Sequence, residues 1–95
     1  MVVAIVNRIV AEDEEVFDRI IERFKNRARL VDRMPGFMGI ELFVNRERRE
    51  VLVITRWRSR EDMERWLESA EFRMAHRGGG SRASSEGIVY EVIEV

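Results

Sequence analysis

The spacing of apolar and polar positions predicts four strands and one long helix. Apolar, mostly β-branched runs fill residues 2–10, 37–44, 51–57 and 88–95, and such runs are typical of strands. Between the first two runs, residues 12–31 repeat apolar side chains at helical spacing and so predict the main helix. The apolar face of this helix consists of Phe17, Ile20, Ile21, Phe24, Ala28 and Val31.

The second strand follows a turn at residues 34–36, Met-Pro-Gly, which stops the main helix. Side chains two apart share a side of a regular strand. We therefore expect two groups on opposite sides, Met38, Ile40, Leu42 and Val44 on one and Phe37, Glu41 and Phe43 on the other. The charged residues 45–49 then form a hairpin connection to the third strand.

A second helical region is expected at residues 59–77, as two short segments joined at Ser69. Ser59 and Ser69 are each followed by an acidic residue in the first turn, which is typical of helix starts. Residues 78–87, rich in glycine, serine and arginine, cannot continue a helix and are expected to form a loop. His76 therefore lies near a helix C-terminus, beside this flexible connection.

The element order is β-α-β-β-α-β, which predicts an α+β, ferredoxin-like single domain over residues 1–95. Two helices would cover one face of a four-stranded antiparallel sheet. The first, third and fourth strands are apolar on both sides over much of their length, although a monomer should expose a polar second face. Burying a Val, Ile or Leu fully is worth roughly 1.5–3 kcal/mol. We therefore expect a homodimer formed sheet to sheet, unless helices or loops wrap further around the sheet.

Composition excludes several classes of function. The chain has 17 basic and 18 acidic residues, which favours neither nucleic acid nor an anionic membrane. It has no cysteine, so disulfides, thiolate metal sites and a cysteine nucleophile are excluded, and a reducing cytoplasm suits it. The apolar start is broken by Asn7 and Arg8, so we expect neither a signal peptide nor a membrane span.

Three residues are candidates for chemistry: Asn7, Trp66 and His76. A single histidine near a helix end is usually structural, but a neutral imidazole beside a glycine run also suits an axial ligand to heme iron. Trp66 on an apolar stripe reads as core, or as a side chain that presses on a flat ligand. Asn7 interrupts an apolar strand. Its side-chain amide either forms a hydrogen bond with a sheet edge or an ordered water, or it donates one to an iron-bound ligand.

These residues fall into a pattern that resembles the IsdG-type heme-degrading monooxygenases of the antibiotic-biosynthesis-monooxygenase-like superfamily. The landmarks are Asn7, the segment 22–37, the spacing from Trp57 to Trp66, and the segment that ends in Met-Ala-His-Arg at position 77. The Pro-Gly-Phe turn and the tryptophan spacing occur across the superfamily and indicate the fold. The combination of Asn7, Trp66 and His76 is the more specific part of the resemblance.

The resemblance implies a dimeric α/β barrel in which heme is both substrate and cofactor. His76 would be the axial ligand of the heme iron, Trp66 would ruffle the ring, and Asn7 would donate a hydrogen bond on the distal side. Arg27 would pair with a heme propionate and Phe24 would contact the cofactor. Dioxygen and an external electron donor, a reductase or a small reductant, would open the ring and release iron. The glycine-rich loop departs from the family pattern, which leaves the cleavage position and product open.

Two other functions stay open at this point. One is a cofactor-independent monooxygenase acting on an aromatic quinol or polyketide, with Asn7 and Trp66 lining its pocket. The other is a non-catalytic heme-binding dimer, a store or carrier. Oxygen uptake without iron would indicate the first, and stable heme binding in the presence of a reductant would indicate the second.

Overall fold

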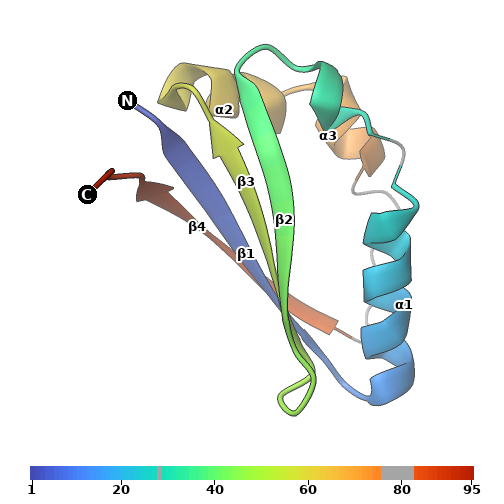
Figure 1. The fold of residues 1–95 in the computed structure, drawn as a ribbon. Helices are drawn as coiled ribbons and strands as arrows, with labels where there is room; N and C mark the ends of the chain where they lie inside the picture. The colour runs from blue at the N-terminus through green and yellow to red at the C-terminus, as the bar shows by residue number, and fades with distance from the viewer. Residues whose placement is uncertain (28, 76–82) are drawn as a thin grey trace.

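The elements of the computed structural model follow the predicted order (Figure 1). The structure describes residues 1–27, 29–75 and 83–95. Its elements are β1 (Val3–Ala11), α1 (Glu14–Lys25), the short 3-10 turn η1 (Val31–Arg33), β2 (Phe37–Asn45), β3 (Glu50–Trp57), α2 (Arg60–Leu67), α3 (Ala70–Ala75) and β4 (Ala83–Glu91). The α+β, ferredoxin-like arrangement is thus confirmed, with the second helical region divided into α2 and α3.

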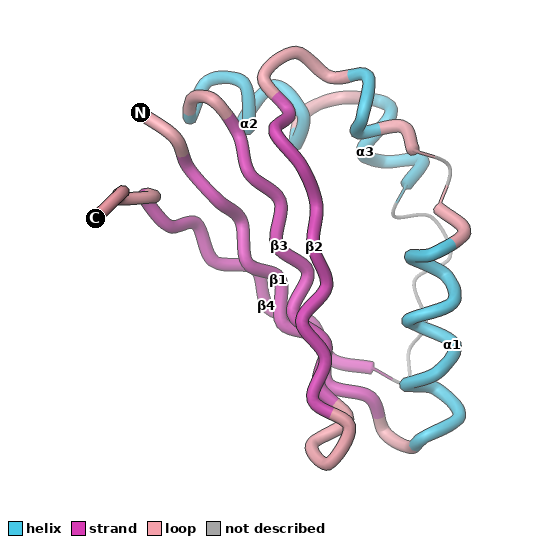
Figure 2. The backbone as a smooth tube through the Cα atoms, in the orientation of Figure 1, coloured by secondary structure: helices cyan, strands magenta, loops and turns pink. Residues whose placement is uncertain are grey.

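The four strands form one antiparallel sheet in the order β2-β3-β1-β4. The helices all lie on one side of it (Figure 2). Because β2 and β4 are edges, the sheet of a single chain is open and is not closed into a barrel. The dimeric part of the expected α/β barrel therefore stays a prediction about two copies of the chain.

Alternate residues of β1 point toward the helices and divide the core into two clusters. Val3 lies in one cluster with η1 and α2 side chains, and Ala11 lies in the other with α1 side chains. The buried members of the first are Val3, Val31, Trp57, Met63 and Trp66, and those of the second are Ala11, Val16, Phe17, Val51 and Val53. Asn7 falls between the two clusters along β1, because Ile5 packs on the first and Ile9 on the second.

The other face of the sheet, which we call the outer face, is covered by no helix of the described residues and carries apolar side chains together with the ion pairs Arg8–Glu50 and Arg56–Glu41. Phe43 of β2 and Ile88 and Tyr90 of β4 are 50%, 43% and 49% exposed. They pair across the strands with Leu52, Val6 and Ala4. The expectation that apolar side chains occupy both faces of the sheet is therefore confirmed.

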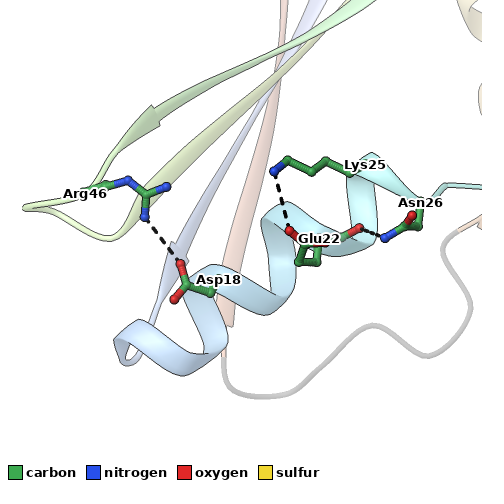
Figure 3. Close-up of polar contacts among 5 residues, drawn as sticks. All are labelled: Asp18, Glu22, Lys25, Asn26 and Arg46. Carbon is green, nitrogen blue, oxygen red and sulfur yellow. Dashed lines mark hydrogen bonds and ion pairs between the residues drawn. The ribbon is translucent and has the colours of Figure 1, made fainter.

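The main helix is shorter than expected, since α1 ends at Lys25 and not at residue 31. Asn26 ends it by donating its side-chain amide to the Glu22 carbonyl at 2.9 Å, and Lys25 pairs with the Glu22 carboxylate at 3.5 Å (Figure 3). Arg29 then has a φ of 58°, which breaks the helical path, and Val31 reaches the core from η1. Ala28, the remaining member of the predicted apolar face, lies outside the described residues.

The two sides expected for β2 are also wrong at its start. Phe37 pairs with Trp57 but Gly39 pairs with Arg56, so the register shifts between them. This bulge, with Gly39 at a φ of 141°, turns Phe37 to the same side as Ile40, where its ring meets the Trp57 ring edge-on at 5.5 Å.

The two serine caps are confirmed. The Ser59 hydroxyl accepts a hydrogen bond from the Asp62 amide at 3.2 Å, and the Ser69 hydroxyl accepts one from the Phe72 amide at 3.0 Å. The last strand differs from its predicted bounds of 88–95, because pairing with β1 begins at Ala83 and the strand ends at Glu91. The part of the predicted loop at 78–82 lies outside the described residues.

Candidate functional site

Asn7 lies in the middle of β1, on the side of the sheet that faces the helices. Its strand partners are Val53 of β3, which is buried, and Gly87 of β4, which is exposed. Within the described ranges, the side-chain amide of Asn7 makes no hydrogen bond. No buried side-chain nitrogen or oxygen of those ranges lacks a partner, so this amide keeps access to solvent or to a ligand. The structure therefore does not support a side-chain amide bonded to a sheet edge, while a bond to water and a bond to an iron-bound ligand both stay predictions.

Trp66 is 5% exposed and belongs to the first core cluster. Its indole stacks on Trp57 at a centroid distance of 6.3 Å and an angle of 24°, and it meets the Phe72 ring edge-on at 5.5 Å. The Ser59 cap starts α2, and the Ser69 cap turns the chain so that Phe72 returns to this cluster. The structure thus places Trp66 as a core residue, and a contact with a ligand stays a prediction.

Phe24 and Arg27 lie at the end of α1, where the helix gives way to η1. Phe24 is half-buried against the second core cluster. The Arg27 amide donates to the Phe24 carbonyl at 3.4 Å, and the Arg27 side chain is 21% exposed. Asp32 of η1 accepts from the Arg27 guanidinium at 2.7 Å.

Asp32 was not singled out from the sequence, yet it organises this end of α1. Its carboxylate binds both Arg27, at 2.7 Å, and Arg29, at 3.5 Å. The hydrogen bond from Arg27 holds the pKa of Asp32 below its ordinary value, and the positive charges of Arg27 and Arg29 act in the same direction against the effect of burial. The single acid within a basic run at residues 27–33 was the sequence signal for this cluster.

His76 lies outside the described residues, so its predicted position and role stay predictions. The structure describes α3 as ending at Ala75, the residue before it. Of the named candidates, Phe24 packs against the second core cluster and Trp66 lies in the first, whereas Asn7 falls between the two clusters along β1.

A shallow hollow of about 110 Å³ lies elsewhere, between the start of α1 and the β2–β3 hairpin. It is lined by Glu14, Phe17, Asp18 and Arg46. The Arg46 guanidinium sits 5.4 Å from the Phe17 ring centre and 3.4 Å from the Asp18 carboxylate (Figure 3). Arg46 thus joins the β2–β3 hairpin to α1 across this hollow. Since none of the candidate residues lines the hollow, we do not assign a function to it.

The described residues fit the chemistry of a heme. A flat, mainly apolar ring with carboxylate substituents needs apolar walls, a polar group near its metal and a cation for its carboxylates. The side of the sheet around Asn7 is apolar, and the Asn7 side-chain amide is accessible and unpaired in the described ranges. The Arg27 guanidinium is of the right type for a carboxylate, but Asp32 already binds it at 2.7 Å. The apolar wall and the accessible amide suit the group that the sequence resemblance implies, whereas its iron ligand, His76, lies outside the described residues.

The fold and these residues define a known class of protein. A model of the antibiotic biosynthesis monooxygenase family matches residues 1–78, and the chain belongs to that family. In the part of the chain that the structure covers, we find no helix with the length and apolar character needed to cross a membrane.

Among curated proteins, the chain is 40% identical over 65 residues to a heme-degrading monooxygenase of Bacillus cereus strain B4264. It is 39% identical over 62 residues to a protein of the same name from Halalkalibacterium halodurans. These matches cover 65% and 62% of this chain but only 60% and 53% of the relatives' lengths. The resemblance to heme-degrading monooxygenases of this family is thus confirmed, while the roles of Asn7, Trp66 and His76 stay predictions.

Among solved structures, the heme degrader MhuD of Mycobacterium tuberculosis, with two hemes bound in its active site, matches with a TM-score of 0.77 and 26% identity. That match covers 98% of this chain and 97% of MhuD. A mutant form of SnoaB of Streptomyces nogalater, a cofactor-independent oxygenase, also matches this chain, with a TM-score of 0.77. That match covers 99% of this chain and 95% of the SnoaB chain. At 21% identity, the SnoaB likeness speaks for the fold alone.

Proposed function

We propose that this protein is a heme-degrading monooxygenase that takes heme as both substrate and cofactor. The curated relatives with that name and the heme-bound MhuD structure support this proposal. The observation that carries it on this chain is the Asn7 amide. It faces the helices from an apolar strand, is accessible, and has no hydrogen-bond partner within the described residues. Such an amide suits a ligand that brings a polar group into an apolar site.

The proposed roles divide between the ring and its substituents. His76 would bind the heme iron as axial ligand, and Asn7 would donate a hydrogen bond on the opposite side of the ring. Trp66 would contact the ring and help to orient it. Phe24 would pack against the ring, and Arg27 would bind a propionate through its guanidinium.

When bound, heme would supply the iron that activates dioxygen and the ring that is opened. The protein's residues would set the orientation of the ring, exclude water from the apolar side of the sheet and place the Asn7 N–H group. The reaction also needs electrons from outside the chain, from a reductase or a small reductant, and would end with release of iron. The absence of cysteine suits a reducing compartment, and we place the enzyme in the cytoplasm.

We further propose that two chains associate through their outer faces to form the dimeric barrel. The half-exposed side chains of Phe43, Ile88 and Tyr90 support this arrangement. Covering apolar area is worth roughly 25 cal/mol for each Å² removed from water. A second copy presents the same apolar surface and satisfies the two-fold symmetry common in homodimers.

The proposed function is tested by titrating the purified chain with hemin and following the Soret band. Wild type should bind about one heme per chain with an axial nitrogen ligand, and His76→Ala should lose the ligated spectrum. Ascorbate and air should then bleach the Soret band of wild type, with iron captured by a chelator.

Two outcomes would contradict the proposal. A Soret band that stays stable with ascorbate would indicate a heme carrier. Hemin spectra identical to free hemin for both proteins, with oxygen uptake on a quinol and no iron, would indicate a cofactor-independent oxygenase.

A further inference from the structure

Gly87 is the β4 partner of Asn7, and the fold gives no reason for a glycine at this position. Pairing between β1 and β4 runs through it without a shift of register, so there is no bulge. Gly87 does not have a positive φ; among the described glycines, Gly36 and Gly39 do. A glycine inside a strand costs stability, because it loses more chain entropy and packs no side chain.

Packing does not require a glycine here either. Among the described residues, a Cβ built on Gly87 would meet a single atom within 4 Å, the Asn7 Oδ1, at 3.9 Å, which is an ordinary van der Waals distance. By contrast, a Cβ on Gly36 would collide with the Asp62 side chain. Space for a side chain is therefore open at Gly87, and that space lies beside the accessible Asn7 amide on the side facing the helices.

The row of paired residues across the sheet shows where this space lies. Leu42, Val53, Asn7 and Gly87 are consecutive partners from β2 to β4. Val53 is buried and Leu42 packs on the second core cluster, whereas Gly87 is exposed. The row is thus covered on the β2–β3 half and open on the β4 half. A glycine inside a strand is often found where a ligand approaches the backbone closely.

We propose that Gly87 is a specificity-determining residue, whose missing side chain leaves room for the flat ring of heme beside the Asn7 amide. This inference rests on the proposed function. A planar macrocycle can lie against bare backbone, whereas a branched side chain would stand roughly perpendicular to the sheet and fill the space. Larger side chains at this position would therefore exclude heme without harming the strand.

The test compares full-length wild type with Gly87→Ala and Gly87→Val. Hemin affinity is measured by Soret titration, and the melting temperature of the heme-free chain is measured by circular dichroism. Gly87→Val should weaken hemin binding about tenfold or more, since over-filling a packed site is unfavourable. The same variant should melt no lower than wild type, because valine favours strands over glycine. Gly87→Ala should lie between the two in affinity.

Glu91→Val is the matched control. Glu91 is exposed on the same strand and, as the partner of Val3, on the same side, but roughly 13 Å further along. The Glu91→Val variant places the same side chain on β4, and its affinity for hemin should lie within about twofold of that of wild type.

Three outcomes would overturn the inference. If wild type binds hemin and Gly87→Val binds it with the same affinity, the proposed function stands and only the role of Gly87 fails. A marked fall in the melting temperature of Gly87→Val would show that the fold itself needs the glycine. No hemin binding by wild type would remove the proposed function and this inference together.

Discussion

Trp66 shows how one side chain can serve both the core and a site. It stacks on Trp57 and meets the edge of Phe72, so α2, α3 and the sheet are joined through one indole. Any ligand role of Trp66 is therefore added to a structural one. Asn7 is the opposite case, because its amide has no partner in the described part of the chain and contributes no hydrogen bond to the fold there.

The position of Trp66 in the core predicts different effects for two substitutions of this residue. Trp66→Ala should lower the free energy of unfolding by about 3–5 kcal/mol, since it opens a cavity in the first core cluster. Trp66→Phe keeps an aromatic ring and should cost less. Urea denaturation of the heme-free protein measures both. Equal stability of Trp66→Ala and wild type would contradict the placement of this residue in the core.

At the scale of elements, the end of α1 and the turn η1 are joined by charge. The Asp32 carboxylate binds Arg27 and Arg29, and Arg29 adopts a φ of 58° that is unfavourable for a residue with a side chain. The ion pairs thus accompany a backbone path that local preference alone would not choose. This path brings Val31 into the first core cluster.

The Asp32 cluster predicts a pH dependence of stability. Since the folded pKa of Asp32 lies below its ordinary value, the ionised form stabilises the fold. This contribution is fully present above the unfolded pKa of about 3.9 and is lost as pH falls through the lower folded value. Asp32→Asn should remove the corresponding slope from the free energy of unfolding measured below about pH 4.

Arg27→Gln provides the matched comparison, because it removes the largest cause of the lowered pKa and should flatten the same slope. A wild-type slope that both variants leave unchanged would show that Asp32 is not the group responsible.

For the whole molecule, the decisive feature is the sheet with one covered and one uncovered face. The helices cover the inner face except along β4, while Phe43, Ile88 and Tyr90 stay half-exposed on the outer face. Apolar surface of this kind marks interaction sites in soluble proteins.

The proposed dimer predicts that Ile88→Glu yields a monomer, because a charge would be buried at the centre of the interface. Sedimentation equilibrium of wild type and variant measures the change in mass. Leu67→Glu is the control, since Leu67 is a 38% exposed apolar residue on α2, away from the outer face, and should leave the dimer intact. A wild-type chain that sediments as a monomer would contradict the proposal.

The fold class was predictable from the sequence because strand and helix periods, turn residues and serine caps act over a few neighbouring residues. The apolar character of both sheet faces follows from the same local pattern. Asn7 was identifiable as a candidate because an amide inside an apolar strand is visible in the pattern alone. Trp66 was identifiable too, although the choice between core and ligand contact needed its neighbours.

The tertiary structure decided what depends on contacts between distant segments. Strand register placed Gly87 beside Asn7, and a bulge after Phe37 turned that ring toward Trp57. The end of α1 was set by the Asn26 cap, and the Asp32 ion pairs accompany the path that follows it. Local pattern determines which elements form, because their periods are short. Register, bulges and ion pairs between elements determine which side chains meet, because those energies exist only once the sheet and helices have packed.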